Sequence, residues 1–231
     1  GVEIEKYSVR YYPRGASIAP LIGRLNSKGD GIAGIEQEFN DLLKGKNGEK
    51  EISTSNDSSS YFNPKVLTKK KNGEDIQLTI DANIQFMAYD AIKNSVKRHD
   101  AESGSAIILS PNGEILAMAN YPADNPNDKT TYIPENYKNR VLTDLLEPGS
   151  TMKPFTMLLA LDQGKITAEE DECFDVTKRV AHIKPTYNDL KKYKCMTVKK
   201  ILQKSDNLGT VKVVELLDNE QVYEAWNNLG F

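Results

Sequence analysis

The clearest periodic pattern in this 231-residue chain lies in its middle third. Residues 76–80 alternate apolar and polar side chains, which predicts a short strand. Asp81 follows at a position where its carboxylate can accept backbone N–H groups and cap a helix. Apolar residues then recur every three or four positions, so we expect an amphipathic helix that runs to about His99. Its apolar face is predicted to consist of Ile84, Met87, Ala88, Ala91, Ile92 and Val96.

Two β-rich runs come after this helix, at residues 105–109 and 114–120. They are joined by Ser110-Pro111-Asn112-Gly113, which is a strong turn signal. The pattern therefore predicts an antiparallel hairpin.

Helical patterns return toward the end of the chain. Residues 150–163 are predicted to form a helix, and Pro154 is compatible with it because the first four N–H groups of a helix have no internal partner. A short helix over residues 197–203 is expected to break at residues 205–207. Residues 208–217 are expected to form the next helix.

The N-terminal part of the chain has no comparable regularity. Glycines divide it into short β-like stretches and turns, and residues 35–43 alone place apolar side chains at helical spacing. A serine-rich stretch at residues 53–60 is typical of an exposed loop, and a lysine-rich turn at residues 69–73 marks the expected domain boundary. We therefore expect an α+β protein with two regions, residues 1–73 and 74–231.

Composition narrows the classes of function. Hydrophobic residues make up 39% of the chain, which is enough for a core, and the net charge is −3 with both signs spread along the whole length. A nucleic-acid partner is therefore not expected. The longest apolar runs are far shorter than the ~20 residues that cross a bilayer, so membrane attachment would need an anchor outside this chain.

Histidine and cysteine usage limits the metal chemistry. His99 and His182 are the only histidines, which argues against a histidine-rich metal site, and we expect neither a metal nor a cofactor. Cys173 and Cys195 fit neither a CxxC redox pair nor a paired-CxxC zinc site. Whether these two cysteines are free, buried or bridged stays open.

Ser150-Thr151-Met152-Lys153 brings a hydroxyl and an amine together on a predicted first helical turn. Positions i and i+3 have Cβ atoms about 5–6 Å apart, so the Lys153 nitrogen can reach the Ser150 oxygen. A serine hydroxyl becomes a good nucleophile only when a neighbouring base removes its proton. Because lysine has an ordinary pKa of about 10.4, burial or a cationic neighbour would have to lower it here. Ser150 is thus a candidate nucleophile and Lys153 its candidate base.

Ser205-Asp206-Asn207 is a second polar cluster, in the turn predicted between two helices. From such a turn, the Ser205 hydroxyl and the Asn207 amide could point back at the nucleophile. Taken alone, the cluster is equally typical of a plain turn or a helix cap, and a Ser-x-x-Lys match is common by chance. A Ser-His-Asp hydrolase is disfavoured because neither histidine lies in a nucleophile-elbow context.

In this order the two clusters resemble the S-x-x-K and S-D-N boxes of penicillin-binding proteins and class A β-lactamases. Residues 139–153, with Glu147-Pro148-Gly149 before Ser150, are similar to class B penicillin-binding proteins of the septal, division-specific type, also called the penicillin-binding protein 3 type. The elongation-specific type is the nearest alternative. Further stretches that resemble class B are Arg10-Tyr11-Tyr12-Pro13, Ala19-Pro20-Leu21-Ile22-Gly23, Gly34-Ile35-Glu36 and residues 78–81, 102–106 and 113–120.

This resemblance implies a fold and a set of residue roles. The fold would be an irregular α+β pedestal followed by the first part of a β-lactamase-like transpeptidase domain, with helices packed on an antiparallel sheet. Ser150 would attack the penultimate D-Ala carbonyl of a peptidoglycan stem peptide and form an acyl-enzyme, and Lys153 would take its proton. Ser205 would relay a proton to the leaving amine, and Asn207 would bind a substrate amide and orient Lys153.

The resemblance also implies partners and a location. The expected ligands are stem peptides that end in D-Ala-D-Ala, and β-lactam antibiotics that mimic this end. Other division proteins are expected to bind the N-terminal region. The protein would be held in the bacterial inner membrane by one N-terminal anchor, with this region in the periplasm.

The third box of the family, Lys-Thr/Ser-Gly, does not occur in the sequence. Without it a carboxylate-binding site and one oxyanion N–H group would be missing, so the 231-residue polypeptide alone is expected to react poorly or not at all. Two alternatives stay open. One is a β-lactamase or β-lactam sensor, which the large region before Ser150 disfavours, and the other is a division-protein docking fragment without catalysis.

Overall fold

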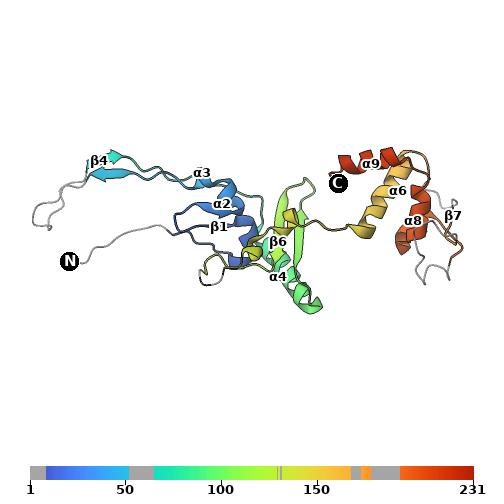
Figure 1. Cartoon of the computed structure of the whole chain (residues 1–231), viewed down its shortest axis with the longest axis horizontal. Helices are drawn as coiled ribbons and strands as arrows, with labels where there is room; N and C mark the ends of the chain where they lie inside the picture. Colours follow the sequence, from blue (N-terminus) through green and yellow to red (C-terminus); the bar gives the residue numbers. More distant parts are fainter. Residues whose placement is uncertain (1–8, 52–64, 129, 131, 168–172, 178–192) are drawn as a thin grey trace, which may run out of the picture. The chain divides into compact units, whose positions relative to one another are not determined.

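The computed structural model describes residues 9–51, 65–128, 130, 132–167, 173–177 and 193–231 (Figure 1). The chain divides into two compact units, Gly1–Leu145 and Leu146–Phe231. Both units combine helices with antiparallel strand pairs, which confirms the expected α+β class.

Helix α4 (Ala82–His99) begins and ends where the sequence predicts. The Asp81 carboxylate accepts hydrogen bonds from the backbone N–H groups of Ile84, at 3.0 Å, and Asn83, at 2.8 Å. These two bonds hold the pKa of Asp81 below its usual value, because they stabilise the charged carboxylate. At the other end, Asp100 adopts the left-handed conformation and stops the helix.

The buried face of α4 differs in part from the predicted one. Met87, expected in the core, is 61% exposed, and Ala91 is exposed as well, whereas Gln85 is 1% exposed. The Gln85 amide donates to Ser17 O at 2.7 Å and Met118 O at 3.1 Å, and accepts from Met118 N at 2.7 Å. A polar side chain is stable in this position because the surrounding backbone satisfies its hydrogen bonds.

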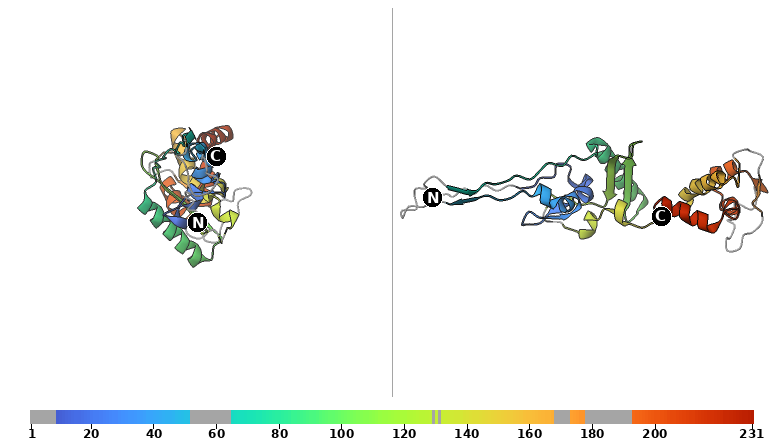
Figure 2. Two further views of the ribbon diagram at one scale, coloured as in Figure 1. Left: turned by 90° about the vertical axis from the view of Figure 1, so that its left-hand side faces the viewer. Right: turned by 90° about the horizontal axis from the view of Figure 1, so that it is seen from above.

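The predicted hairpin is present as β5 (Gly104–Leu109) and β6 (Ile115–Tyr121), paired antiparallel. Gly113 takes a positive φ of 85° in the turn between them, where a side chain would be strained. Strand β6 packs against α4, as Figures 1 and 2 show, and Ala117 and Ala119 are completely buried there. Ile107, Ile108 and Leu109 of β5 are exposed.

The region before α4 consists of short elements. The single helix predicted over residues 35–43 is interrupted at Phe39, where φ is −106° and ψ is 24°. Asn40 follows the interruption and accepts a hydrogen bond from Gly31 N at 2.9 Å, so a side-chain contact outside the helix accompanies the break. The elements are η1 (Gly15–Ser17), α1 (Ala19–Ile22), β1 (Arg24–Leu25), β2 (Gly31–Ala33), α2 (Gly34–Glu38) and α3 (Asn40–Leu43).

One ion pair connects two sequence stretches of this region that resemble class B proteins. Glu36 is 4% exposed, and its two carboxylate oxygens accept from the Arg10 guanidinium at 2.8 and 3.2 Å. Such two-point pairing is the strong form of a salt bridge, because the planar guanidinium matches the carboxylate. The contact ties the segment before η1 to helix α2.

The remaining elements of the first unit are a two-stranded ribbon and two short helices. Strand β3 (Glu49–Glu51) pairs antiparallel with β4 (Lys65–Thr68), and the serine-rich stretch predicted as a loop lies outside the described residues. The turn predicted at residues 69–73 is not formed. Lys71 instead exchanges backbone hydrogen bonds with Lys46, at 2.7 and 2.9 Å, which extends the antiparallel pairing beyond β3 and β4. The two short helices are η2 (Pro134–Tyr137) and α5 (Arg140–Thr143).

The second unit is built from helices around a small apolar core. The helix predicted over residues 150–163 starts as a 3₁₀ turn and continues as an α-helix, because Pro154 has no N–H group to donate to the preceding turn. Met157, Ile201 and Leu208 lie at the centre of the core. The elements are η3 (Gly149–Met152), α6 (Lys153–Asp162), β7 (Phe174–Asp175), β8 (Cys195–Met196), α7 (Val198–Lys204), α8 (Asn207–Val214) and α9 (Asn219–Asn228).

The two cysteines, whose state the sequence leaves open, form a disulfide. The Cα atoms of Cys173 and Cys195 are 5.6 Å apart, and the bond joins the start of β7 to β8. Within the described ranges there is no helix long and apolar enough to cross a bilayer. The same ranges hold no group of three His, Cys, Asp or Glu side chains that could bind a metal ion.

Candidate active site

Ser150 lies in η3, the 3₁₀ turn that leads into α6. Gly149 precedes it with a positive φ of 59°, and the Thr151 hydroxyl donates to Pro148 O at 2.5 Å, so the turn is closed on both sides of the serine. Side chains at i and i+3 eclipse each other in a 3₁₀ turn, which places Ser150 and Lys153 on the same side. Ser150 is exposed, as a nucleophile that meets a substrate must be.

Lys153 is the first residue of α6 and is 9% exposed. Its ammonium nitrogen donates to the Ser205 hydroxyl at 3.0 Å and to Asn207 Oδ1 at 2.6 Å. It also donates to the backbone carbonyl of Ser205. The structure therefore brings Lys153, Ser205 and Asn207 into direct contact, although more than fifty residues separate the lysine from the other two.

The acceptors of Lys153 come from the bend between α7 and α8, where the sequence predicts a break. Ser205 ends α7 in the left-handed conformation, with φ 52° and ψ 41°. Asp206 caps α8 by accepting from Gly209 N at 2.6 Å, and Asn207 is the first residue of that helix. Ser205 and Asn207 are exposed, as Ser150 is, whereas the Lys153 side chain that contacts them is buried.

The three oxygens around Lys153 are chemically different, and this difference directs the proton. A lysine that donates to all three carries three protons and cannot accept another. When it is neutral, one contact must reverse so that the nitrogen lone pair becomes an acceptor. The Ser205 carbonyl and the Asn207 amide oxygen can only accept, whereas the Ser205 hydroxyl can also donate. Among these three groups, Ser205 Oγ is thus the one that can exchange a proton with the lysine.

Other residues considered from the sequence do not join this cluster. His99 is exposed at the end of α4 in the first unit, and His182 lies outside the described residues. Trp226, on α9, is 36% exposed. One residue that the sequence analysis did not single out for a role is Asp206, which is 3% exposed and lies between the two acceptors of Lys153. An acidic residue directly before a predicted helix was the available signal.

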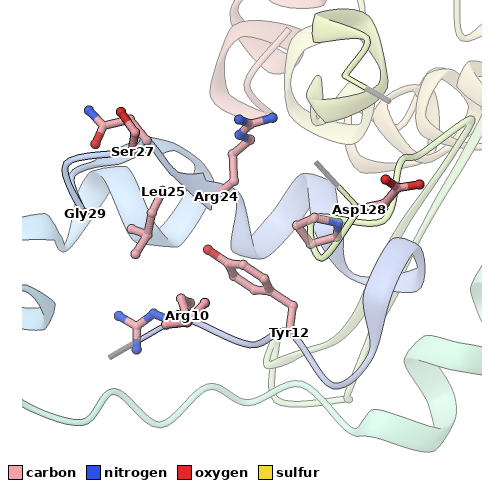
Figure 3. A pocket seen from close by; sticks show the side chains of 10 residues that line it. Arg10, Tyr12, Arg24, Leu25, Ser27, Gly29 and Asp128 are labelled. Carbon is pink, nitrogen blue, oxygen red and sulfur yellow. The ribbon is translucent and has the colours of Figure 1, made fainter. Parts of the chain in front are cut away.

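An open cavity of about 430 Å³ lies in the first unit, and Arg10, Tyr12 and Arg24 are among the residues that line it (Figure 3). Arg10 is paired with Glu36, and the Arg24 guanidinium lies 4.2 Å from the centre of the Tyr132 ring. Burial raises the pKa of Tyr12, whose ring points into the cavity, to about 12, and the nearby Glu36 charge adds to this shift. The cavity holds no nucleophile next to a base, so the candidate chemistry stays with the second unit.

Comparison with protein families agrees with the geometry of the second unit. The family model described as the penicillin-binding protein transpeptidase domain matches residues 104–231, which is more than half of the chain. The chain belongs to this family. A model of the penicillin-binding protein dimerisation domain matches residues 1–78 of the same penicillin-binding protein chain.

Curated relatives and solved structures are similar to this penicillin-binding protein over most of its length. A probable peptidoglycan D,D-transpeptidase, PbpC, of Pseudomonas aeruginosa is 38% identical and aligns with 99% of the chain and 40% of the relative. The peptidoglycan D,D-transpeptidase FtsI of Buchnera aphidicola is 35% identical over all of the chain and 40% of the relative. The chain thus spans about two fifths of the length of these relatives.

A solved structure shows the same fold. The apo form of penicillin-binding protein 3 from Mycobacterium tuberculosis superposes with a TM-score of 0.77 at 24% identity, covering 94% of this chain and 45% of that one. This structure shows the fold alone, whereas the matched family models and the FtsI relative confirm the resemblance to penicillin-binding proteins of the class B, PBP3 type.

Proposed function

We propose that this chain is part of a serine-type peptidoglycan D,D-transpeptidase that cross-links stem peptides at the division septum and is a target of β-lactams. The observation that carries the proposal is the contact of Lys153 with Ser205 and Asn207 next to the turn that presents Ser150. The names of the relatives, which are peptidoglycan D,D-transpeptidases, support the same reaction class.

In the proposed first half-reaction, Ser150 Oγ attacks the carbonyl of the penultimate D-Ala while neutral Lys153 takes the hydroxyl proton. The lysine, now with three protons, donates to the Ser205 hydroxyl as it does in the structure. Ser205 passes a proton to the departing D-Ala nitrogen as the peptide bond breaks, and an ester to Ser150 remains. Asn207 keeps Lys153 in place and binds a substrate amide.

In the second half-reaction, an amine of a neighbouring peptide strand attacks the ester carbonyl. Lys153, left neutral by the first half-reaction, takes a proton from the amine as the new amide bond forms. The bond to Ser150 Oγ then breaks, and Lys153 returns this proton to the serine oxygen. A β-lactam would enter the first half-reaction in place of D-Ala-D-Ala and leave a stable acyl group on Ser150.

The decisive experiment locates the adduct. The full-length protein is treated with a fluorescent penicillin, digested, and analysed by mass spectrometry, with a Ser150→Ala variant as the control. We expect one acyl group on the peptide that contains Ser150 and no labelling of the alanine variant. An adduct on another residue, or labelling that survives in the variant, would contradict the proposal.

The 231-residue polypeptide on its own is proposed to be a poor catalyst. The family's third box supplies an oxyanion N–H group, and losing one such donor costs about 10²- to 10³-fold in rate. We therefore expect the polypeptide to acylate at least about 10²-fold more slowly than the full-length protein under the same conditions. Equal labelling rates would show that the two boxes present here suffice.

The domain roles and the location are also proposals. Residues 1–73 are proposed to be a pedestal that binds other division proteins, and residues 74–231 to be the N-terminal part of the transpeptidase domain, in a protein anchored in the inner membrane and facing the periplasm. The match of the first residues to a dimerisation domain supports a binding role for that region. A fluorescent fusion should accumulate at mid-cell; an even distribution along the side wall would favour the elongation-specific alternative.

A further inference from the structure

Ser205 holds a backbone conformation that a serine adopts only under constraint. Its φ of 52° and ψ of 41° are left-handed, and within the described ranges Asp100 is the one other non-glycine residue with a positive φ. Left-handed backbone is unfavourable for residues with a Cβ, so it persists where the surroundings enforce it. In this conformation the carbonyl and the hydroxyl of Ser205 both accept hydrogen bonds from Lys153.

Asp206 supplies the contacts that enforce this conformation. Its N–H group donates to Ile201 O at 2.9 Å, which closes the end of α7 over Ser205. Its carboxylate accepts a hydrogen bond from Gly209 N at 2.6 Å, and its carbonyl accepts one from the Thr210 hydroxyl at 2.7 Å. These two bonds hold the first turn of α8, which begins directly after Asp206. Asp206 is 3% exposed, so these hydrogen bonds are shielded from competition with water.

The packing of the two helices leaves the bend little room to relax. A Cβ atom at Gly209 would lie 2.5 Å from Ile201 Cγ1 and 2.7 Å from its Cδ1, so α8 approaches α7 as closely as a glycine permits. Ile201 is completely buried and belongs to the core of the unit. A change at Asp206 is therefore transmitted to Ser205 and Asn207, its two neighbours, rather than absorbed by loose packing.

We propose that Asp206 is a positioning residue that holds the oxygens of Ser205 and Asn207 against Lys153 through the cap it forms on α8. This inference rests on the proposed function, because the consequence of misplacing these oxygens is slow acylation of Ser150. The capping oxygen, Oδ1, is the essential atom. Oδ2 is buried without a hydrogen-bond partner in the described part of the chain, so the cap does not depend on it.

The two oxygens allow a test that separates positioning from stability. Asp206→Asn keeps an oxygen for Gly209 N but turns the charge-assisted hydrogen bond of the carboxylate into a weaker neutral one, so this variant should be less stable than the wild type and yet acylate at a similar rate. Asp206→Ala loses the cap. Asp218→Ala is the matched control, because Asp218 caps α9 in the same unit by accepting from Glu220 N at 2.9 Å and has no contact with Lys153 among the described residues.

The experiment uses the full-length protein and separates non-covalent binding of a chromogenic β-lactam from the first-order acylation step by stopped-flow kinetics. We expect Asp206→Ala to slow acylation by about 10- to 100-fold with little change in binding, since a small misplacement of a reacting group costs rate rather than affinity. Asp206→Asn and Asp218→Ala should acylate like the wild type, although both lose thermal stability. Wild-type acylation in the Asp206→Ala variant, or equally slow acylation in the alanine and asparagine variants, would overturn the proposal.

Hydrogen exchange of the amides from residue 201 to residue 210 gives a readout that does not need the reaction. Protection of Gly209 N should fall in Asp206→Ala and return in Asp206→Asn, because the amide bonds to the capping oxygen. A wild-type protein that does not acylate while this exchange pattern appears would contradict the proposed function alone. A wild type that acylates while the exchange pattern is missing would contradict the role of Asp206 alone.

Discussion

Helices α4 and α7 end in the same way and are followed by different structures. Each ends in a left-handed residue, Asp100 or Ser205, and in each the next residue donates its N–H group to a carbonyl one turn back. The two bonds are Ala101 N to Val96 O at 3.0 Å and Asp206 N to Ile201 O at 2.9 Å. After α4 the chain continues into strand β5, and after α7 it starts helix α8 at once.

The residue after the left-handed position accounts for this difference. Ala101 has no side-chain acceptor, whereas Asp206 accepts from Gly209 N and so provides a start for a new helix. The second helix is what brings Asn207 next to Lys153. The comparison teaches that a common helix ending becomes part of a candidate active site through one capping carboxylate and one buried lysine.

The largest expected effect comes from removing that lysine. Lys153→Met keeps the length of the side chain but removes the base and the hydrogen bonds to Ser205 and Asn207. We expect acylation by a β-lactam to fall by about 10²- to 10⁴-fold, the usual contribution of general base catalysis. Lys97→Met, an exposed lysine in the last turn of α4, is the control and should leave the rate unchanged. Similar rates in both variants would remove Lys153 from the mechanism.

Glycine substitutions at the two left-handed positions, Asp100 and Ser205, should have different effects on acylation. Asp100→Gly relieves backbone strain and should change the free energy of unfolding by no more than about 1 kcal/mol, with unchanged acylation. Ser205→Gly relieves the same strain but removes the hydroxyl next to Lys153, so acylation should fall by about 10²-fold while the protein stays folded. Thermal melting and β-lactam kinetics measure both. A fully active Ser205→Gly variant would show that the Ser205 hydroxyl relays no proton in the reaction.

The disulfide lies in the unit that contains α7, and the unit that contains α4 has no cysteine. Cys195 lies shortly before α7, and its bond to Cys173 closes a segment with a sequence separation of 22. Replacing both cysteines by serine should cost about 3 kcal/mol, mainly because the unfolded chain becomes less restricted. Chemical denaturation monitored by hydrogen exchange should show the loss in residues 146–231 and not in α4. Equal destabilisation of the two units would mean that they do not unfold independently.

The smallest effect concerns the cap of α4. The pKa of Asp81 is held below its unfolded value by the N–H groups of Ile84 and Asn83, so its carboxylate stabilises the folded state above the unfolded pKa of about 3.9. This contribution is lost as the pH falls through the lower, folded value. Asp81→Asn should therefore be slightly less stable than the wild type at pH 7 and equally stable in strong acid. A melting-temperature difference that does not depend on pH would contradict the assignment.

The local structure of both helix ends could be read from the sequence to a large extent. The spacing of apolar residues predicted α4, the turn of four residues predicted the hairpin, and the polar run at 205–207 predicted a break. The strand predicted at residues 76–80 was wrong, because the structure forms no strand there. The predicted buried face of α4 failed where contacts with distant residues decide burial. Gln85 is buried because backbone groups of Ser17 and Met118 satisfy its amide, whereas Met87 is exposed, and no local pattern predicts such partners.

The sequence by itself determined which groups are available: a hydroxyl and an amine one helical turn apart, a polar break between two helices, and two cysteines. Their order and spacing express local physics, because helix periods, caps and turns depend on neighbours along the chain. The tertiary structure alone decided that Lys153 is buried and donates to Ser205 and Asn207, and that Cys173 is bonded to Cys195. These outcomes depend on how α6, α7 and α8 pack around Ile201, and packing joins residues whose separation in sequence carries no information about their distance in space.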